Sequence, residues 1–167
     1  GGGINCSNSK PKLQNLIIKN NDSEYAGGIY IGEGSEVNIE NVIIHDNKSM
    51  GGTGIWCHSS WMAVVNVTIT NNISSEPSGG MAIQARSTAF LYNVIIWDNF
   101  PEQVTIENSL NKVSFYHCNI EGGEAGLIFN ETSNDEVNWG DGNIGENPQL
   151  NETKQLTNTS PCIGSGT

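Results

Sequence analysis

The sequence predicts an all-β fold, a right-handed single-stranded parallel β-helix of about six to seven coils with three short strands per coil. Two recurring patterns indicate it. A seven-residue strand pattern recurs at intervals of 24 to 27 residues, starting at Asn15, Asn41, Asn66, Asn93 and, in a degenerate copy, His117. A pair containing glycine, followed by an alternating triplet, recurs in the same phase at residues 2–6, 27–31, 53–57 and 79–83. Such near-equal repeats are typical of a solenoid, in which each coil buries its apolar side chains against the next.

Each coil divides into three strands when positions that stay apolar at a period of two are aligned. The inward residues of the first strand are Ile4, Cys6, Ile29, Ile31, Ile55, Cys57, Met81, Ile83, Val104 and Ile106. Those of the second are Val37, Ile39, Met62, Val64, Ala89, Leu91, Val113 and Phe115. Those of the third are Leu16, Ile18, Val42, Ile44, Val67, Ile69, Val94, Ile96, Cys118 and Ile120. The crossover preference of parallel strands predicts the right hand.

Two asparagine columns mark the corners of the coil. Asn15, Asn41, Asn66 and Asn93 fall between the second and third strands, and Asn21, Asn47, Asn72 and Asn99 follow the third. Asparagine tolerates left-handed backbone dihedrals, and its amide can bond to the equivalent asparagine of the next coil. We therefore expect two structural ladders rather than catalytic groups.

We expect one β-helix domain over residues 1–167, with regular coils over 1–123 and looser closing coils over 124–167. Residues 126–129 predict the first strand of a sixth coil, 137–144 its remainder, and 150–163 a partial seventh coil. The repeat begins at Gly1 without an amphipathic cap. We therefore expect the chain either to be part of a longer protein or to self-associate end to end through its first coil.

The last third of the chain carries three motifs, at residues 139–144 (WGDGNI), 147–150 (NPQL) and 160–163 (SPCI). With the repeats, they resemble the right-handed parallel β-helix repeat domains of large secreted or surface proteins of bacteria, whose closing segment ends in SPCIDAG. The resemblance implies an extracellular or cell-surface location. It is not specific for function, because that family includes adhesins, autotransported surface proteins, glycan-binding modules, polysaccharide lyases and glycoside hydrolases.

The net charge limits the classes of partner, and the cysteine positions limit the possible disulfides. Seven Lys and Arg residues against 18 Asp and Glu give a net charge of −11, which disfavours nucleic acid and anionic lipid surfaces. No apolar run is long enough to cross a membrane. Cys6 and Cys57 lie two coils apart, too far for a disulfide. A pair between Cys118 and Cys162 stays open.

An enzyme is the less favoured reading. A lyase acting on uronates needs a basic cluster, but Arg86 is the only arginine and the six lysines are scattered. A hydrolase needs carboxylates on neighbouring coils. Asp46 and Asp98 share a column but lie two coils apart, about 10 Å, and both occupy turns where Asp is common. They form the weak catalytic alternative.

A metal site is a weaker alternative still. Asp135, Glu136, Asp141 and Asn143 could supply oxygen ligands to Ca²⁺. Otherwise we expect no cofactor, because no histidine cluster has metal-ligand spacing.

Outward positions suggest binding surfaces. Ile17, Ile43 and Ile95 share an outward column with Thr68, which is an interaction site, is covered by a flanking segment, or only reflects the strand preference of isoleucine. Tyr30 and Trp56 point outward on the first strand, and Phe90, Tyr92 and Tyr116 on the second. Sugar rings stack on such exposed aromatic rings.

We therefore expect a non-catalytic extracellular solenoid with a structural, adhesive or assembly role, contacting a polysaccharide or protein partner through an outward face. A carbohydrate-active enzyme of the β-helix type is the alternative.

Overall fold

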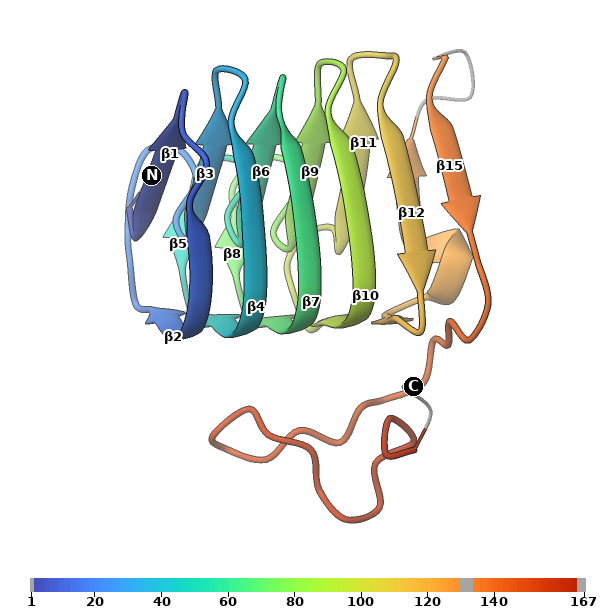
Figure 1. The fold of residues 1–167 in the computed structure, drawn as a ribbon. Coiled ribbons are helices and arrows are strands. Elements are labelled where there is room, and N and C mark those ends of the chain that lie inside the picture. The colour runs from blue at the N-terminus through green and yellow to red at the C-terminus, as the bar shows by residue number, and fades with distance from the viewer. Residues whose placement is uncertain (1, 130–133, 165–167) are drawn as a thin grey trace.

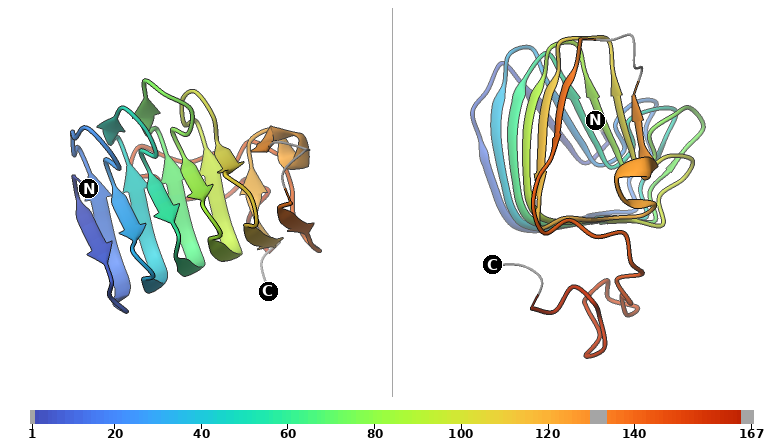
Figure 2. Two further views of the ribbon diagram at one scale, coloured as in Figure 1. Left: turned by 90° about the horizontal axis from the view of Figure 1, so that it is seen from above. Right: turned by 90° about the vertical axis from the view of Figure 1, so that its right-hand side faces the viewer.

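The computed structural model describes residues 2–129 and 134–164; residue 1, residues 130–133 of the predicted sixth coil and residues 165–167 lie outside the described part. The chain winds into a parallel solenoid whose coils lie side by side along one axis (Figure 1). The right-hand view of Figure 2 looks along the axis of the same stack, so that the coils overlap. The predicted fold class is confirmed.

The first strands of successive coils form a six-stranded parallel sheet. Its members are β1 (Ile4–Ser7), β3 (Ile29–Gly32), β6 (Ile55–His58), β9 (Met81–Gln84), β11 (Val104–Glu107) and β14 (Leu127–Phe129). Equivalent residues of the repeat pair with each other, as Ile29 does with Ile55 and Ile55 with Met81. These strands enclose five full turns, slightly fewer than the number of coils predicted.

The second and third predicted strands join into one bent sheet. Its members are β2 (Lys12–Lys19), β4 (Glu36–His45), β7 (Trp61–Thr70), β10 (Thr88–Trp97), β12 (Lys112–Tyr116) and β15 (Glu136–Trp139), with β13 (Asn119–Ile120) paired to β10. Each long strand bends at an asparagine with φ 55°, as at Asn41 and Asn66. In the loops that lead to the next coil, β5 (Lys48–Ser49) pairs with β8 (Ile73–Ser74). A short 3-10 helix, η1 (Gly123–Gly126), precedes β14.

The interior is a continuous apolar column formed by the predicted inward positions. Except in the first coil, every predicted inward side chain is buried, while Ile4 and Leu16 at the open edge are half-buried. Phe115 fills the last complete coil, and Trp139 packs on it with ring centroids 5.6 Å apart. The strands β1 and β2 are the edge strands of their sheets, so end-to-end association through this coil stays a prediction.

A buried ladder of asparagine side chains runs along one corner; we call it the inner ladder (Asn21, Asn47, Asn72 and Asn99). Asn47 Nδ2 donates to Asn72 Oδ1 at 2.9 Å, and Asn72 Nδ2 donates to Asn99 Oδ1 at 3.0 Å. The Asn72 amide also donates to the backbone carbonyl of Ile44. Gln103 ends the ladder by accepting from Asn99 at 2.9 Å. The predicted ladder is confirmed.

The predicted column at the bend forms a second ladder, here called the outer ladder (Asn15, Asn41, Asn66 and Asn93). Asn66 Nδ2 donates to Asn41 Oδ1 at 3.3 Å, and Asn93 Nδ2 donates to Asn66 Oδ1 at 3.2 Å. All four residues have φ 55°, a left-handed conformation that asparagine adopts more readily than most residues. Backbone geometry at this corner therefore explains the column.

Sequence reasoning missed a third ladder, here called the serine ladder, at the corner between the first and second strands. Each backbone N–H bonds to the side chain one coil further on: Ser35 to Ser60 Oγ, Ser60 to Ser87 Oγ, and Ser87 to Asn111 Oδ1. The signal was present, since these residues recur at 24 to 27 positions. The mixture of serine, asparagine and aspartate hid it.

The predicted seventh coil is wrong. Residues 145–164, here called the closing segment, leave the stack and lie below the bent sheet (Figure 1). Proline lacks the N–H that a stacked strand donates, and Pro148 and Pro161 stand in this segment. Its polar part closes on itself, because Asn151 Oδ1 accepts from the backbone N–H groups of Thr153 and Gln155, and Leu150 bridges to Leu156.

The four cysteines are free thiols. Cys118 points into the core and its Sγ bonds to the carbonyls of Leu91 and Tyr116, whereas Cys162 lies outside the sheet and accepts from Asn119 Nδ2. Since residues 118 and 119 point to opposite faces of the sheet, the pair left open in the sequence does not form. Burial raises the pKa of both Cys57 and Cys118 to about 11.

The raised pKa values predict selective thiol chemistry. At pH 8 a thiol with a pKa near 11 stays protonated, and only the thiolate is nucleophilic. A disulfide reagent should therefore label Cys162 first in the folded protein, and Cys57 and Cys118 only after unfolding. Peptide mass spectrometry of native and denatured samples measures the order. Rapid native labelling of Cys57 would contradict the inward assignment.

The core predicts that Ile44→Asp unfolds the whole stack rather than one coil. The change places an unpaired carboxylate between Ile18 and Ile69, at a cost of several kcal/mol, against a total stability of about 5–15 kcal/mol. Circular dichroism should show loss of the β-sheet signal. The matched control is Ile17→Asp, at a side chain that is 64% exposed on the opposite face, which should keep it.

The inner ladder predicts a large effect for Asn72→Ala. The change leaves the Asn99 acceptor, the Asn47 donor and the Ile44 carbonyl without their buried partner, so we expect a loss of about 2–5 kcal/mol. Urea denaturation measures it. Asn66→Gly in the outer ladder is the control, because glycine accepts its left-handed φ and the two lost bonds are exposed. Equal losses in the two variants would argue against the inner ladder as the stronger constraint.

Candidate functional surfaces and the cleft under the closing segment

The structure divides the predicted aromatic residues into two groups. Tyr30 and Trp56 lie on the outer side of the first sheet, with ring centroids 5.6 Å apart in an edge-to-face arrangement. Trp56 also contacts Tyr25 from a loop, and its Nε1 donates to Gln84 Oε1 at 3.0 Å. Gly52 lies against this tryptophan, where any added Cβ would come within 2.6 Å of it. These two rings are therefore held by neighbouring side chains and half-buried.

The second group lies on the second-strand face of the bent sheet. We call it the aromatic surface: Trp61, Phe90, Tyr92 and Tyr116. Phe90 and Trp61 have ring centroids 6.1 Å apart, and Tyr92 pairs in register with Tyr116 on the next coil. Phe90 is 48% exposed and Tyr116 37% exposed. The Tyr116 hydroxyl accepts from Asn138 Nδ2 at 2.7 Å, so polar groups flank the rings.

Sequence analysis missed Trp61, although the period-two pattern could have found it. Trp61 pairs in register with Thr88 of β10 and is the first residue of β7, two positions before the outward Ala63 that pairs with Phe90. The corner between the first and second strands obscured its phase. The aromatic surface therefore reaches over three coils, β7, β10 and β12.

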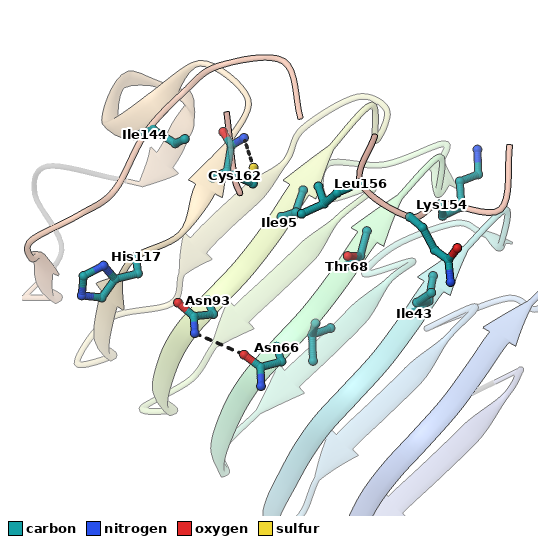
Figure 3. Close-up of a pocket in the computed structure, with 13 residues that line it drawn as sticks. Ile43, Asn66, Thr68, Asn93, Ile95, His117, Ile144, Lys154, Leu156 and Cys162 are labelled. Carbon is teal, nitrogen blue, oxygen red and sulfur yellow. Dashed lines mark hydrogen bonds between the residues drawn. The ribbon is translucent and has the colours of Figure 1, made fainter. Parts of the chain in front are cut away.

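The predicted isoleucine column lies partly under the closing segment. Ile17 is exposed, whereas Ile43, Thr68 and Ile95 are half-buried and line a cavity of about 650 Å³. Figure 3 shows Leu156 of the closing segment beside Ile95, across from the amides of Asn66 and Asn93. The closing segment thus covers part of this column but not Ile17, and a role of the column as an interaction site stays a prediction.

The closing segment is fastened to the stack near its two ends. Asn119 Nδ2 donates to the Glu146 carbonyl at 2.7 Å and contacts Cys162 Sγ at 3.0 Å. Asn119 Oδ1 accepts from the Glu146 N–H at 3.2 Å. One side chain of β13 thus anchors both the start and the end of the segment. The part between them roofs the cavity.

A second cavity, of about 410 Å³, lies beside the first. Its floor includes Thr70, Asn71, Trp97 and Asp98, and its roof is residues 147–151 of the closing segment. Lys154 lines both cavities, with a left-handed φ of 62°. Trp97 and Lys154 were not among the predicted site residues. Trp97 could have been found, because it follows Ile95 at the next outward position.

Asp46 and Asp98, the weak catalytic alternative, lie in the turn after the third strand. Both have left-handed φ values, 54° and 55°, as does Asn71 between them. Asp46 Oδ2 lies 2.6 Å from His45 Nδ1, and the Asp98 N–H donates to Glu121 Oε2. Backbone geometry accounts for a carboxylate or an amide at these turns. Their catalytic role stays a prediction.

The four predicted calcium ligands are not brought together. Glu136 begins β15 and Asp135 directly precedes it, while Asp141 and Asn143 follow its other end, so the extended strand separates the two pairs by more than about 10 Å. Asp135 Oδ1 accepts from Asn111 in the serine ladder, and Asn143 Oδ1 accepts from the Cys118 N–H. Over residues 2–129 and 134–164, no group of three or more His, Cys, Asp or Glu residues could hold a metal. A calcium site stays a prediction.

Comparisons with known proteins address the fold alone. Residues 2–154 match the family described as a right-handed beta helix region. No curated protein and no solved structure matches the chain. Within the described part of the chain, no helix is long and apolar enough to cross a membrane.

Proposed function

Because the chain belongs to the right-handed β-helix family, whose match covers residues 2–154, we propose that it is a non-catalytic solenoid that contacts glycans through the aromatic surface. The observation that carries the proposal is the exposure of Phe90 and Tyr116 on adjacent coils, with Trp61 beside Phe90. Family membership supports the scaffold, and the surface supports the function.

Aromatic rings that stay exposed on a rigid sheet are suited to carbohydrate. The C–H groups of a sugar ring pack on the flat face of an aromatic ring, while its hydroxyls bond to polar groups at the ring edge. On this face the polar groups are the amide of Asn138 and the hydroxyls of Ser114 and Thr88. Tyr92 and Tyr116 pair in register on adjacent coils, about 4.8 Å apart, and Phe90 lies two residues before Tyr92 on the same strand. The rings therefore follow a diagonal that one sugar chain can cover.

The charge of the protein favours neutral glycans. A net charge of −11 repels polyanionic polymers such as polyuronates. Charged residues beside the aromatic surface are paired: Lys112 with Glu136 at 3.1 Å, and Glu36, next to Trp61, with Lys10 at 2.6 Å, so these pairs add no net charge. We therefore propose a neutral polysaccharide as the partner, met outside the cell or at the cell surface, in a bacterial secreted or surface protein like those that the closing motifs resemble.

The test is binding to a panel of neutral and acidic polysaccharides by affinity electrophoresis and calorimetry. We expect binding to a neutral glycan, weakened about tenfold or more by the double change Phe90→Ala and Tyr116→Ala. Tyr25→Ala is the matched control, because Tyr25 is as exposed as Phe90, at 48%, but lies on a loop beside Trp56. It should bind like the unchanged protein.

Two results would contradict the proposal. Equal loss in the control and the double variant would remove the aromatic surface from the argument. Release of reducing ends or unsaturated uronates from the same samples, abolished by Asp46→Asn or Asp98→Asn, would favour the enzyme alternative instead.

A further inference from the structure

We propose that the cleft between the closing segment and the bent sheet is a binding site for a sugar that carries an N-acetyl group. The inference rests on the proposed function in taking glycans as the ligand class, but it uses no residue of the aromatic surface. The two cavities on either side of Lys154 form the cleft, and their volumes, about 650 and 410 Å³, are in the range of small-molecule sites.

The two cavities share one floor. Along β7, Thr68 lines the first cavity and Thr70 the second; along β10, Ile95 lines the first and Trp97 the second. Residues two apart on a strand point to the same face and lie about 7 Å from each other. A ligand ring over Trp97 can therefore extend a short arm over Ile95 without leaving the floor.

The lining of the first cavity is complementary to an acetamido group. Thr68 stands in the column between Ile43 and Ile95, and its hydroxyl has no hydrogen-bond partner among the described residues (Figure 3). Leu156 approaches from the closing segment. An acetamido group combines a methyl, which suits Ile95 and Leu156, with an amide N–H and C=O, which suit Thr68 and the outer-ladder amides. A plain hydroxyl in this place would leave the apolar wall unfilled.

The lining of the second cavity is complementary to a neutral sugar ring. Trp97 supplies a half-buried aromatic ring, and Asn71 and Gln149 supply amides. Asp98 can accept from hydroxyls and Lys154 can donate to them, and neither forms an ion pair within the described part of the chain. One positive and one negative side chain leave the lining without net charge. An acidic sugar has no advantage here.

The closing segment holds a specific backbone conformation where it covers the cleft. Gln149 and Lys154 both hold left-handed φ values, 51° and 62°, which residues other than glycine, asparagine and aspartate seldom adopt. Both residues line the second cavity, and Gln149 Oε1 accepts from the Thr159 hydroxyl, which leaves its Nε2 group as a donor. The segment therefore places two residues with donor groups over the floor at the expense of local backbone strain.

The test compares two disaccharides on the full 167-residue chain by calorimetry and by NMR chemical shifts of the tryptophan indole groups. The probes are N,N′-diacetylchitobiose and cellobiose, which share the β-1,4-linked glucose framework and differ in the acetamido groups. We expect the acetylated sugar to bind about tenfold or more tightly than cellobiose. Equal affinities, or no binding of either sugar, would overturn the proposal.

Variants locate the site. Leu156→Ala and Lys154→Asn lie outside the stack, so they should leave the β-sheet signal unchanged, and asparagine tolerates the left-handed φ of residue 154. We expect Leu156→Ala to reduce the preference for the acetylated sugar, and Lys154→Asn and Trp97→Ala to weaken both sugars. Unchanged binding in all three would overturn the assignment to the cleft.

The two proposals fail separately. The double variant at Phe90 and Tyr116 should keep disaccharide binding in the cleft while it loses polysaccharide binding. Loss of disaccharide binding in that variant would move the acetylated sugar to the aromatic surface and overturn the cleft. If the double variant keeps both polysaccharide and disaccharide binding, the proposed function is contradicted and the assignment of the disaccharide to the cleft is retained.

Discussion

The inner ladder is the constraint on which the rest of the solenoid depends. An asparagine side chain can accept from one neighbour and donate to another, so each member bonds to the coils on both sides. Asn72, fully buried, does this while its amide also satisfies a backbone carbonyl. Aspartate has no donor for the next coil, and an apolar residue would leave the corner backbone unsatisfied. The ladder therefore fixes which residue stands over which.

Because of that register, the repeats in the sequence determine which side chains lie next to each other on each face. Because each residue lies over its equivalent in the coil before, a property that recurs at 24 to 27 residues becomes a continuous column. Inward columns form one apolar core. Outward columns form flat faces, on which two or three aromatic residues are enough to make a surface such as Trp61, Phe90 and Tyr116. Function can vary on such faces without disturbing the core, since the ladders are at the corners.

The closing segment gives the solenoid a feature that the repeats lack. A stack of coils has flat sides, and a flat side offers a small ligand one wall. Residues 145–164 supply a second wall below the bent sheet (Figure 1). The side chain of Asn119 holds this segment near both of its ends. The covered faces of Ile43 and Ile95 thus become a cleft with an apolar part and a polar part. The cleft and the aromatic surface both lie on the outer face of the bent sheet, on opposite sides of its bend.

By itself, the sequence determined the fold, the two asparagine ladders and the inward set of the regular coils. It could do so because these features are periodic, and a stacked repeat brings equivalents together without any further information. The serine ladder was also present in the sequence, but its three residue types concealed the period. Outward aromatic positions such as Phe90 and Tyr116 followed from alternation alone.

Only the tertiary structure decided where the non-repeating parts lie. It showed that Tyr25, from a loop, packs on Trp56 and that β15 separates Asp135 from Asp141. It also placed Cys162 on the outer side of the sheet, whereas Cys118 points into the core. Above all, it placed Leu156 and Lys154 over Ile95 and Trp97. The closing segment has no equivalent in the repeat, so no register links it to the residues it covers. Its position depends on side-chain contacts between distant parts of the chain, which have no period in the sequence.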